Sequence, residues 1–160
     1  MTCSNPEAAL SQIMEFYPVD AGTIDRRSKT GGLKTVRGAA ASPVMAGFYN
    51  TSPTDLDILT ELACRLLDKG ALDFMGSLVE ITSGGLGGDC FVVSPRWVVL
   101  IADIPDGSIE RLTGLWLAGL AEEYQGSALD EGELRRGLHD LVGVCRKARE
   151  DGVTVVCVWS

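Results

Sequence analysis

The most regular apolar pattern in the chain follows Ser52 and Pro53, where leucine and alanine recur every three or four positions. That spacing places them on one face of an α-helix, at positions 56, 59, 62, 63, 66 and 67. Ser52 is a suitable N-cap, Pro53 suits the first turn, and Asp55 complements the positive end of the helix dipole. The sequence therefore predicts a helix that starts at Pro53 and is closed by Gly70.

Two more helices are predicted towards the end of the chain. The first follows the Pro105–Ser108 turn and ends at Gly126, with apolar residues at 109, 112, 115, 116, 120 and 124. The second starts after Asp130, which forms a capping-box pattern with Glu133, and ends at Gly152. Its apolar positions are 134, 138, 141, 142, 145 and 148.

The N-terminal pattern also favours a helix, because residues 9, 10, 13, 14 and 17 have helical spacing. Ser4 or Asn5 is the expected cap, and Pro18 is expected to end the helix. Residues 18–42 have no convincing period and are interpreted as a long loop with a short strand at 33–36.

Apolar runs bounded by turn residues predict the strands. They comprise Pro43–Tyr49, Leu78–Thr82, Cys90–Ser94, Trp97–Asp103 and Val153–Trp159. The three middle runs are joined by short connections, which link antiparallel neighbours, so we expect a three-stranded meander. Trp97–Ala102 is apolar on both faces, so we expect it to be a central strand of the sheet, covered from both sides.

Together these elements predict an α/β fold of the α+β type, with the order α-β-α-β-β-β-α-α-β. Helices are expected to pack on an antiparallel or mixed sheet of four to five strands. The 160 residues suit a single domain, 1–160, since a chain of this length builds a sizeable core.

Composition narrows the setting of the protein. The longest apolar runs are far shorter than the ~20 residues of a membrane-spanning helix, and the N-terminus lacks a basic and apolar leader. The five cysteines are widely spread and include no Cys-x-x-Cys pair, which argues against disulfide frameworks and zinc sites. We therefore expect a cytoplasmic protein with reduced thiols, no membrane association, no metal and no cofactor.

Charge gives the strongest functional signal. The net charge is -8, and residues 38–160 carry 18 acidic against nine basic side chains. Such a surface repels phosphate backbones and attracts basic partners, so we expect a basic protein partner and no nucleic acid. The simpler interpretation is that the charge only maintains solubility.

Few residues offer catalytic chemistry. The glycines at 84, 85, 87 and 88 lack the strand-to-helix context of a phosphate-binding loop. Cys90 follows them at the mouth of a strand, but a cysteine nucleophile needs a base, and the single histidine, His139, is expected on a helix surface. Asp103 and Asp106 flank a predicted strand end, although turn chemistry also explains them.

An acidic cluster marks the connection between the last two helices. We therefore expect a domain that captures or neutralises a basic partner, as immunity proteins and inhibitors do, with no catalytic residues. The predicted partner-binding residues are Glu122, Glu123, Tyr124, Asp130, Glu131 and Glu133. Two alternatives remain open: a small enzyme that uses Cys90 or the Asp103/Asp106 loop, and a scaffold or assembly subunit with an exposed apolar patch.

Overall fold

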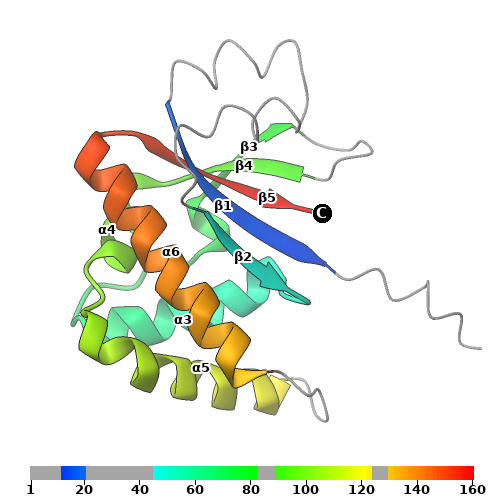
Figure 1. Cartoon of the computed structure of the whole chain (residues 1–160), viewed down its shortest axis with the longest axis vertical. Coiled ribbons are helices and arrows are strands. Elements are labelled where there is room, and N and C mark those ends of the chain that lie inside the picture. Colours follow the sequence, from blue (N-terminus) through cyan, green and yellow to red (C-terminus); the bar gives the residue numbers. More distant parts are fainter. Residues whose placement is uncertain (1–11, 21–44, 83–88, 124–129) are drawn as a thin grey trace, which may run out of the picture.

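Five antiparallel strands form one sheet, and the helices cover one of its faces (Figure 1). A computed structural model describes residues 12–20, 45–82, 89–123 and 130–160. The strand order is β2-β1-β5-β4-β3. In chain order the elements are β1 (Ile13–Val19), β2 (Ala46–Tyr49), α3 (Pro53–Leu66), η2 (Met75–Ser77), β3 (Leu78–Thr82), β4 (Asp89–Val93), α4 (Pro95–Ala102), η3 (Asp106–Ser108), α5 (Ile109–Glu123), α6 (Glu131–Asp151) and β5 (Thr154–Trp159). This is the expected α+β class, but one predicted helix is a strand and one predicted strand is a helix.

The first exchange is at β1, where the predicted helix is wrong. Residues 13–19 form a strand that pairs with both β2 and β5, while most of the expected loop 18–42 lies outside the described residues. Met14 and Phe16 face the helices, and Tyr17 and Val19 belong to a second cluster on the opposite face. A strand buried on both faces has apolar neighbours at spacings that resemble a helical stripe.

The second exchange is at α4, where a central strand was expected. Pro95–Ala102 is a helix whose cap residue, Ser94, accepts a hydrogen bond from the Arg96 N–H at 3.3 Å. Burial follows the helical period, because Ile101 is fully buried while Val99 is exposed. The expected three-stranded meander is therefore a hairpin of β3 and β4, and β5 is the second neighbour of β4.

Helix α3 forms where the leucine pattern predicts it. The Ser52 N–H donates to the Asp55 carboxylate at 2.9 Å, which secures the first turn. The helix ends before Gly70, because Asp68 adopts a left-handed conformation with φ 50°. The Lys69 N–H then reaches the Cys64 carbonyl at 2.9 Å, the hydrogen bond of a Schellman motif.

Helices α5 and α6 are also confirmed within the described residues. The Asp130 carboxylate caps α6 by accepting from the N–H groups of Gly132 and Glu133, at 2.8 and 3.2 Å. Gly152 ends α6 with φ 66°, a conformation that glycine adopts without steric cost. None of the described helices is long and apolar enough to cross a membrane.

Aromatic side chains form the centre of the core between the sheet and the helices. The ring of Phe16 lies 6.0 Å from those of Phe48, Phe74 and Trp97. Trp97 donates its indole N–H to the Thr60 hydroxyl at 2.9 Å, and Trp116 donates to the Asp55 carbonyl at 2.9 Å. The indole N–H groups of Trp97 and Trp116 are thus satisfied. The buried indole N–H of Trp159 has no acceptor among the described residues.

The predicted C-terminal strand, β5, is the central strand of the sheet. Val155 and Cys157 point into the main core, and Val156 and Val158 join the cluster on the opposite face. Every residue from Val155 to Val158 is fully buried. An uninterrupted β-branched run is the expected sequence for a strand covered on both sides.

Candidate functional site

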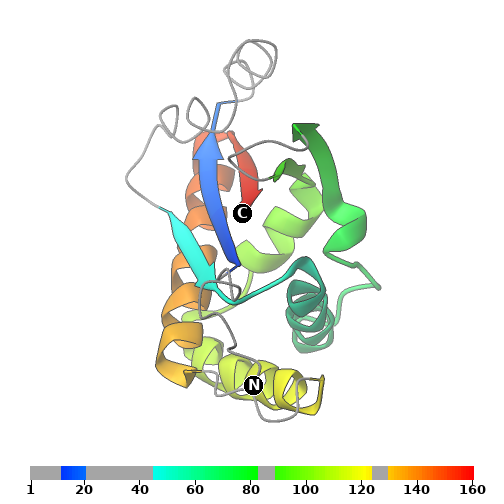
Figure 2. The same cartoon turned by 90° about the vertical axis from the view of Figure 1, so that its right-hand side faces the viewer.

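A shallow groove lies between the edge strand β2 and the N-terminal half of α6, which run side by side (Figures 1 and 2). It encloses about 130 Å³. Its walls combine backbone of β2 with polar side chains of α6, and its lining consists of Gly47, Phe48, Tyr49, Thr51, Asp130, Glu133, Leu134, Arg136, Gly137 and Asp140.

The close approach of β2 to α6 depends on a glycine. Phe48 packs directly on Gly137, where a Cβ atom would lie 2.5 Å from Cε1 of the Phe48 ring. Leu134 and Leu138 flank this contact as buried residues of the same helix face. The floor of the groove is therefore apolar and closely packed.

The outer edge of β2 presents backbone groups. The Asn50 N–H bonds to the Gln12 carbonyl at 2.6 Å, so alternate residues of β2 point their backbone groups towards β1. Gly47 and Tyr49, opposite Glu15 and Ile13, are the residues between, and their N–H and C=O groups point outward. Of these groups the Tyr49 carbonyl accepts a hydrogen bond from the Thr51 hydroxyl at 3.0 Å. β2 is the last strand on its side of the described sheet.

Carboxylates dominate the charge of the groove. Asp130, Glu133 and Asp140 line it together with one cation, Arg136. Asp130 and Glu133 are exposed, and Asp140 lies 3.7 Å from Nδ1 of the exposed His139. The groove is net negative, and the carboxylates of Glu133 and Asp140 accept no hydrogen bond from another described residue.

The structure places the predicted partner-binding residues in three groups. Asp130 and Glu133 line the groove, whereas Glu131 is exposed on the first turn of α6 outside it. Glu122 and Glu123 are exposed at the end of α5, and Tyr124, the expected aromatic anchor, lies outside the described residues.

Sequence reasoning missed two residues of the groove, Asp140 and Tyr49. Tyr49 lines the groove at the end of β2 and is 63% exposed. Because Phe48 points towards α6, the Tyr49 ring is directed to the opposite face of the sheet and does not replace Tyr124 as an anchor in the groove. Its only sequence signal is a bulky aromatic at the end of a short strand. Asp140 belongs to the polar side of α6, where nothing in the sequence singles it out.

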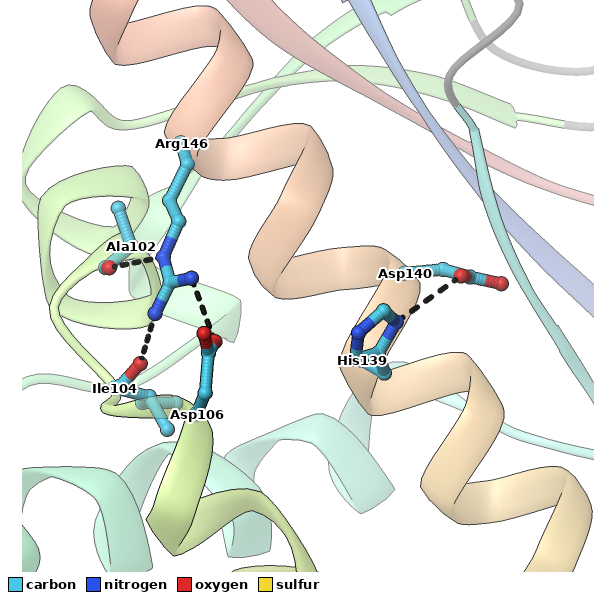
Figure 3. A network of polar contacts seen from close by, with 6 residues as sticks. All are labelled: Ala102, Ile104, Asp106, His139, Asp140 and Arg146. Atoms are coloured by element: carbon cyan, nitrogen blue, oxygen red, sulfur yellow. Dashed lines mark hydrogen bonds and ion pairs between the residues drawn. The ribbon is translucent and has the colours of Figure 1, made fainter.

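The Asp103/Asp106 loop binds α6 rather than forming an open site (Figure 3). The Arg146 guanidinium donates to the Asp106 carboxylate at 2.7 Å and to the carbonyls of Ala102 and Ile104 at 3.1 and 2.6 Å. Arg149 donates to the Asp103 carboxylate at 2.6 Å. Both aspartates thus fix the connection between α4 and α5.

Cys90 and His139 lie apart in the fold. Cys90 is fully buried in the cluster on the far side of the sheet from the helices, contrary to the expectation that it is reachable. Burial raises the pKa of its thiol from 9.0 to about 11, which disfavours the nucleophilic thiolate. His139 is exposed on α6, as predicted. Cys64, Cys145 and Cys157 are free and buried, also as predicted.

The described residues contain no group of three or more histidine, cysteine, aspartate or glutamate side chains arranged to hold a metal. No protein family matches the sequence, and no curated protein or solved structure is significantly similar to it. The fold and the groove define an α+β domain with an acidic groove beside β2, the edge strand of the sheet that the described residues form.

Proposed function

We propose that this protein captures a basic partner through the groove between β2 and α6. The observation that carries the proposal is the convergence of Asp130, Glu133 and Asp140 on one groove beside Tyr49. The net charge of -8 supports it, because a negative field speeds encounter with a cationic protein.

The position of β2 at the edge of the described sheet supports one mode of binding. An extended segment can add a strand to a sheet edge, with main-chain hydrogen bonds supplying affinity and side-chain pockets supplying specificity. The outward N–H and C=O groups belong to Gly47 and Tyr49, and the carboxylates of the groove lie next to them. A segment rich in lysine or arginine fits both features.

The two alternatives have less support. An enzyme would use the carboxylates of Asp103 and Asp106, which are paired with arginines, or Cys90, which is buried with a raised pKa. A scaffold would present a continuous apolar patch. Six of the large exposed apolar side chains of the described residues lie on six different elements, and the seventh, Met45, precedes β2. The six are Tyr49, Leu66, Met75, Val79, Val99 and Leu115.

A synthetic peptide of alternating lysine and valine tests the proposal by titration calorimetry and NMR. We expect it to bind, to shift the amide signals of Gly47 and Tyr49, and to bind more weakly as salt is raised. A peptide with glutamate in place of lysine should not bind. The double variant Glu133→Lys/Asp140→Lys should weaken binding by much more than the ~0.5 kcal/mol scatter of inert surface changes.

The matched control is Glu122→Lys/Glu123→Lys, which makes the same charge change at the end of α5, outside the groove. Little effect there, with a large effect in the groove, supports this site. Equal weakening by both variants would indicate a diffuse acidic surface instead. Binding without salt dependence would contradict the proposal and leave the charge as a solubility device.

A further inference from the structure

A second cavity, of about 380 Å³, lies between the end of α3 and the start of α4, away from the acidic groove. Its walls are mainly apolar: Cys64, Leu72, Pro95, Val99 and Leu100. The volume is in the range of small-molecule sites, which are mostly apolar with a few placed polar groups.

Two cations stand at this cavity, Lys69 and Arg96, and no carboxylate belongs to the described lining. Neither cation forms an ion pair with another described residue. Arg111 and Arg136 are unpaired among the described residues as well, whereas the other five cations each pair with a carboxylate: Arg65, Arg135, Arg146, Lys147 and Arg149. The cavity thus has two cationic side chains and no carboxylate in its described lining, and the nearest acidic residues along the chain are Asp68 and Asp73.

Backbone hydrogen bonds fix the positions from which these two side chains extend. Lys69 is fixed by the Schellman motif that ends α3, through its N–H bond to the Cys64 carbonyl at 2.9 Å. Arg96 is fixed in the first turn of α4, where its N–H bonds to the Ser94 cap. Because the Debye length is about 8 Å at physiological salt, the carboxylates of the acidic groove act only weakly on this cavity.

Part of the wall is unfilled and accessible. A Cβ atom built on Gly70 would meet nothing within 4 Å, so the space beside it is open. Val99 is 42% exposed although it is a large aliphatic side chain. An aliphatic ligand would remove this apolar surface from water.

We propose that this cavity binds a small molecule with an aliphatic chain and a single carboxylate, such as a medium-chain fatty acid. The chain lies against Leu72, Val99 and Leu100, and the carboxylate lies between Lys69 and Arg96. This cavity is separate from the acidic groove, so the proposal does not depend on the proposed capture of a basic partner.

Titration calorimetry with octanoate, 1-octanol and octylammonium tests the charge requirement. We expect octanoate to bind about five-fold more tightly than 1-octanol, since exposed ion pairs contribute modestly, and octylammonium to bind most weakly. Within hexanoate, heptanoate and octanoate, each added CH₂ should tighten binding about four-fold while it is fully buried. No binding of octanoate, or equal binding of the alcohol, would overturn the proposal.

The variant Lys69→Gln/Arg96→Gln should remove the preference for octanoate while leaving 1-octanol binding unchanged. Retained binding of the alcohol shows that the cavity is still folded. The control Arg111→Gln/Lys147→Gln removes the same charge from surfaces outside the cavity and should keep the preference. A preference that survives loss of Lys69 and Arg96 would place the carboxylate elsewhere.

A third variant, Gly70→Phe, places a ring in the cavity and should abolish octanoate binding. Gly107→Phe is its control, because Gly107 is equally exposed, has equal space for a Cβ atom and does not line the cavity. Unchanged binding by Gly70→Phe would assign octanoate to another site. A tetrapeptide that ends in leucine is a competing ligand. If it binds more tightly than octanoate, the cavity recognises a peptide C-terminus rather than a fatty acid, and the proposal is overturned.

Discussion

Gly137 lies directly beneath Phe48, so close that a single added methyl group would lie 2.5 Å from Cε1 of the ring. This contact joins α6 to β2, the strand at the edge of the sheet. It also sets the width of the acidic groove, because both residues line it. The proposed site thus depends on a residue that contributes no side chain.

Replacement of Gly137 by alanine should lower the free energy of unfolding by about 1–3 kcal/mol, since overpacking displaces the ring or the strand. It should also weaken binding of the lysine-valine peptide. Gly143→Ala in the same helix is the control, because its Cβ atom would meet nothing within 4 Å. That change should stabilise by about 0.5–1 kcal/mol through helix propensity alone. Urea unfolding of both variants measures the contrast, and equal effects would contradict the packing argument.

Arg146 should be the most important surface arginine for stability. Arg146→Met removes three hydrogen bonds and leaves the Ile104 and Ala102 carbonyls without this donor, so we expect a loss of about 1.5–3 kcal/mol. Arg149→Met removes one exposed contact to Asp103 and should cost less than about 1 kcal/mol. Hydrogen exchange at the α4–α5 connection should quicken only in the first variant. A similar loss of stability in both variants would show that the Arg146 hydrogen bonds to the α4–α5 connection do not stabilise the fold.

Thr60 should matter through its contact with Trp97 rather than through its helix. Thr60→Val leaves the buried indole N–H without an acceptor, which costs about 1–3 kcal/mol. Thr113→Val is a close control, since Thr113 is also buried and its hydroxyl also donates to the carbonyl four residues earlier. That change should cost less than about 1 kcal/mol. Thermal unfolding compares them, and Thr60→Ser should restore most of the loss.

Alkaline pH should destabilise the protein through its buried thiols. Burial raises the pKa of Cys90 from 9.0 to about 11 and also raises those of Cys145 and Cys157. The native state therefore keeps protons that the unfolded state releases. The stabilisation is complete below pH 9 and is lost as the pH rises towards 11, by at most about 1.4 kcal/mol per pH unit for each thiol.

Urea midpoints at pH 7.5, 9.0 and 10.5 measure this loss. Cys90→Ala removes one of the titrating thiols, so its stability should fall less steeply above pH 9 than that of the wild-type protein. Identical slopes for the two proteins would show that Cys90 does not retain its proton in the native state.

Much of the fold follows from local signals in the sequence. The caps at Ser52 and Asp130, the left-handed Gly152 and the leucine spacing each act within a few residues, and α3, α5 and α6 form where they predict. β5 is predictable because only a buried strand explains its β-branched run. These elements need no information about distant parts of the chain.

The two wrong predictions, at β1 and α4, arise where contacts between distant parts of the chain determine the secondary structure. β1 is apolar at helical spacing, but β2 and β5 supply partners along its length. In α4 the β-branched residues Val98 and Val99 favour a strand, yet Ser94 and Pro95 start a helix that buries Trp97 and Ile101. Local propensity is a weak prior that tertiary packing overrides.

Only part of the candidate site could be predicted from local patterns in the sequence. Asp130 and Glu133 belong to one cap, so a local pattern finds them. Tyr49 and Asp140 meet them only because β2 packs against α6. The sequence signal for that packing is Gly137. A glycine inside a helix predicts such a close contact only when the residue packed on it, here Phe48, is known.

The central position of β5 also sets the order in which the sheet can assemble during synthesis. Among the described strands, the pair β1 and β2 and the pair β3 and β4 are joined only through residues 154–159. Met14 pairs with Trp159, which is synthesised much later. Contacts between residues so far apart in the sequence are non-local, and such contacts slow folding. Until the ribosome has released β5, each hairpin exposes an unpaired inner edge that a chaperone would have to protect.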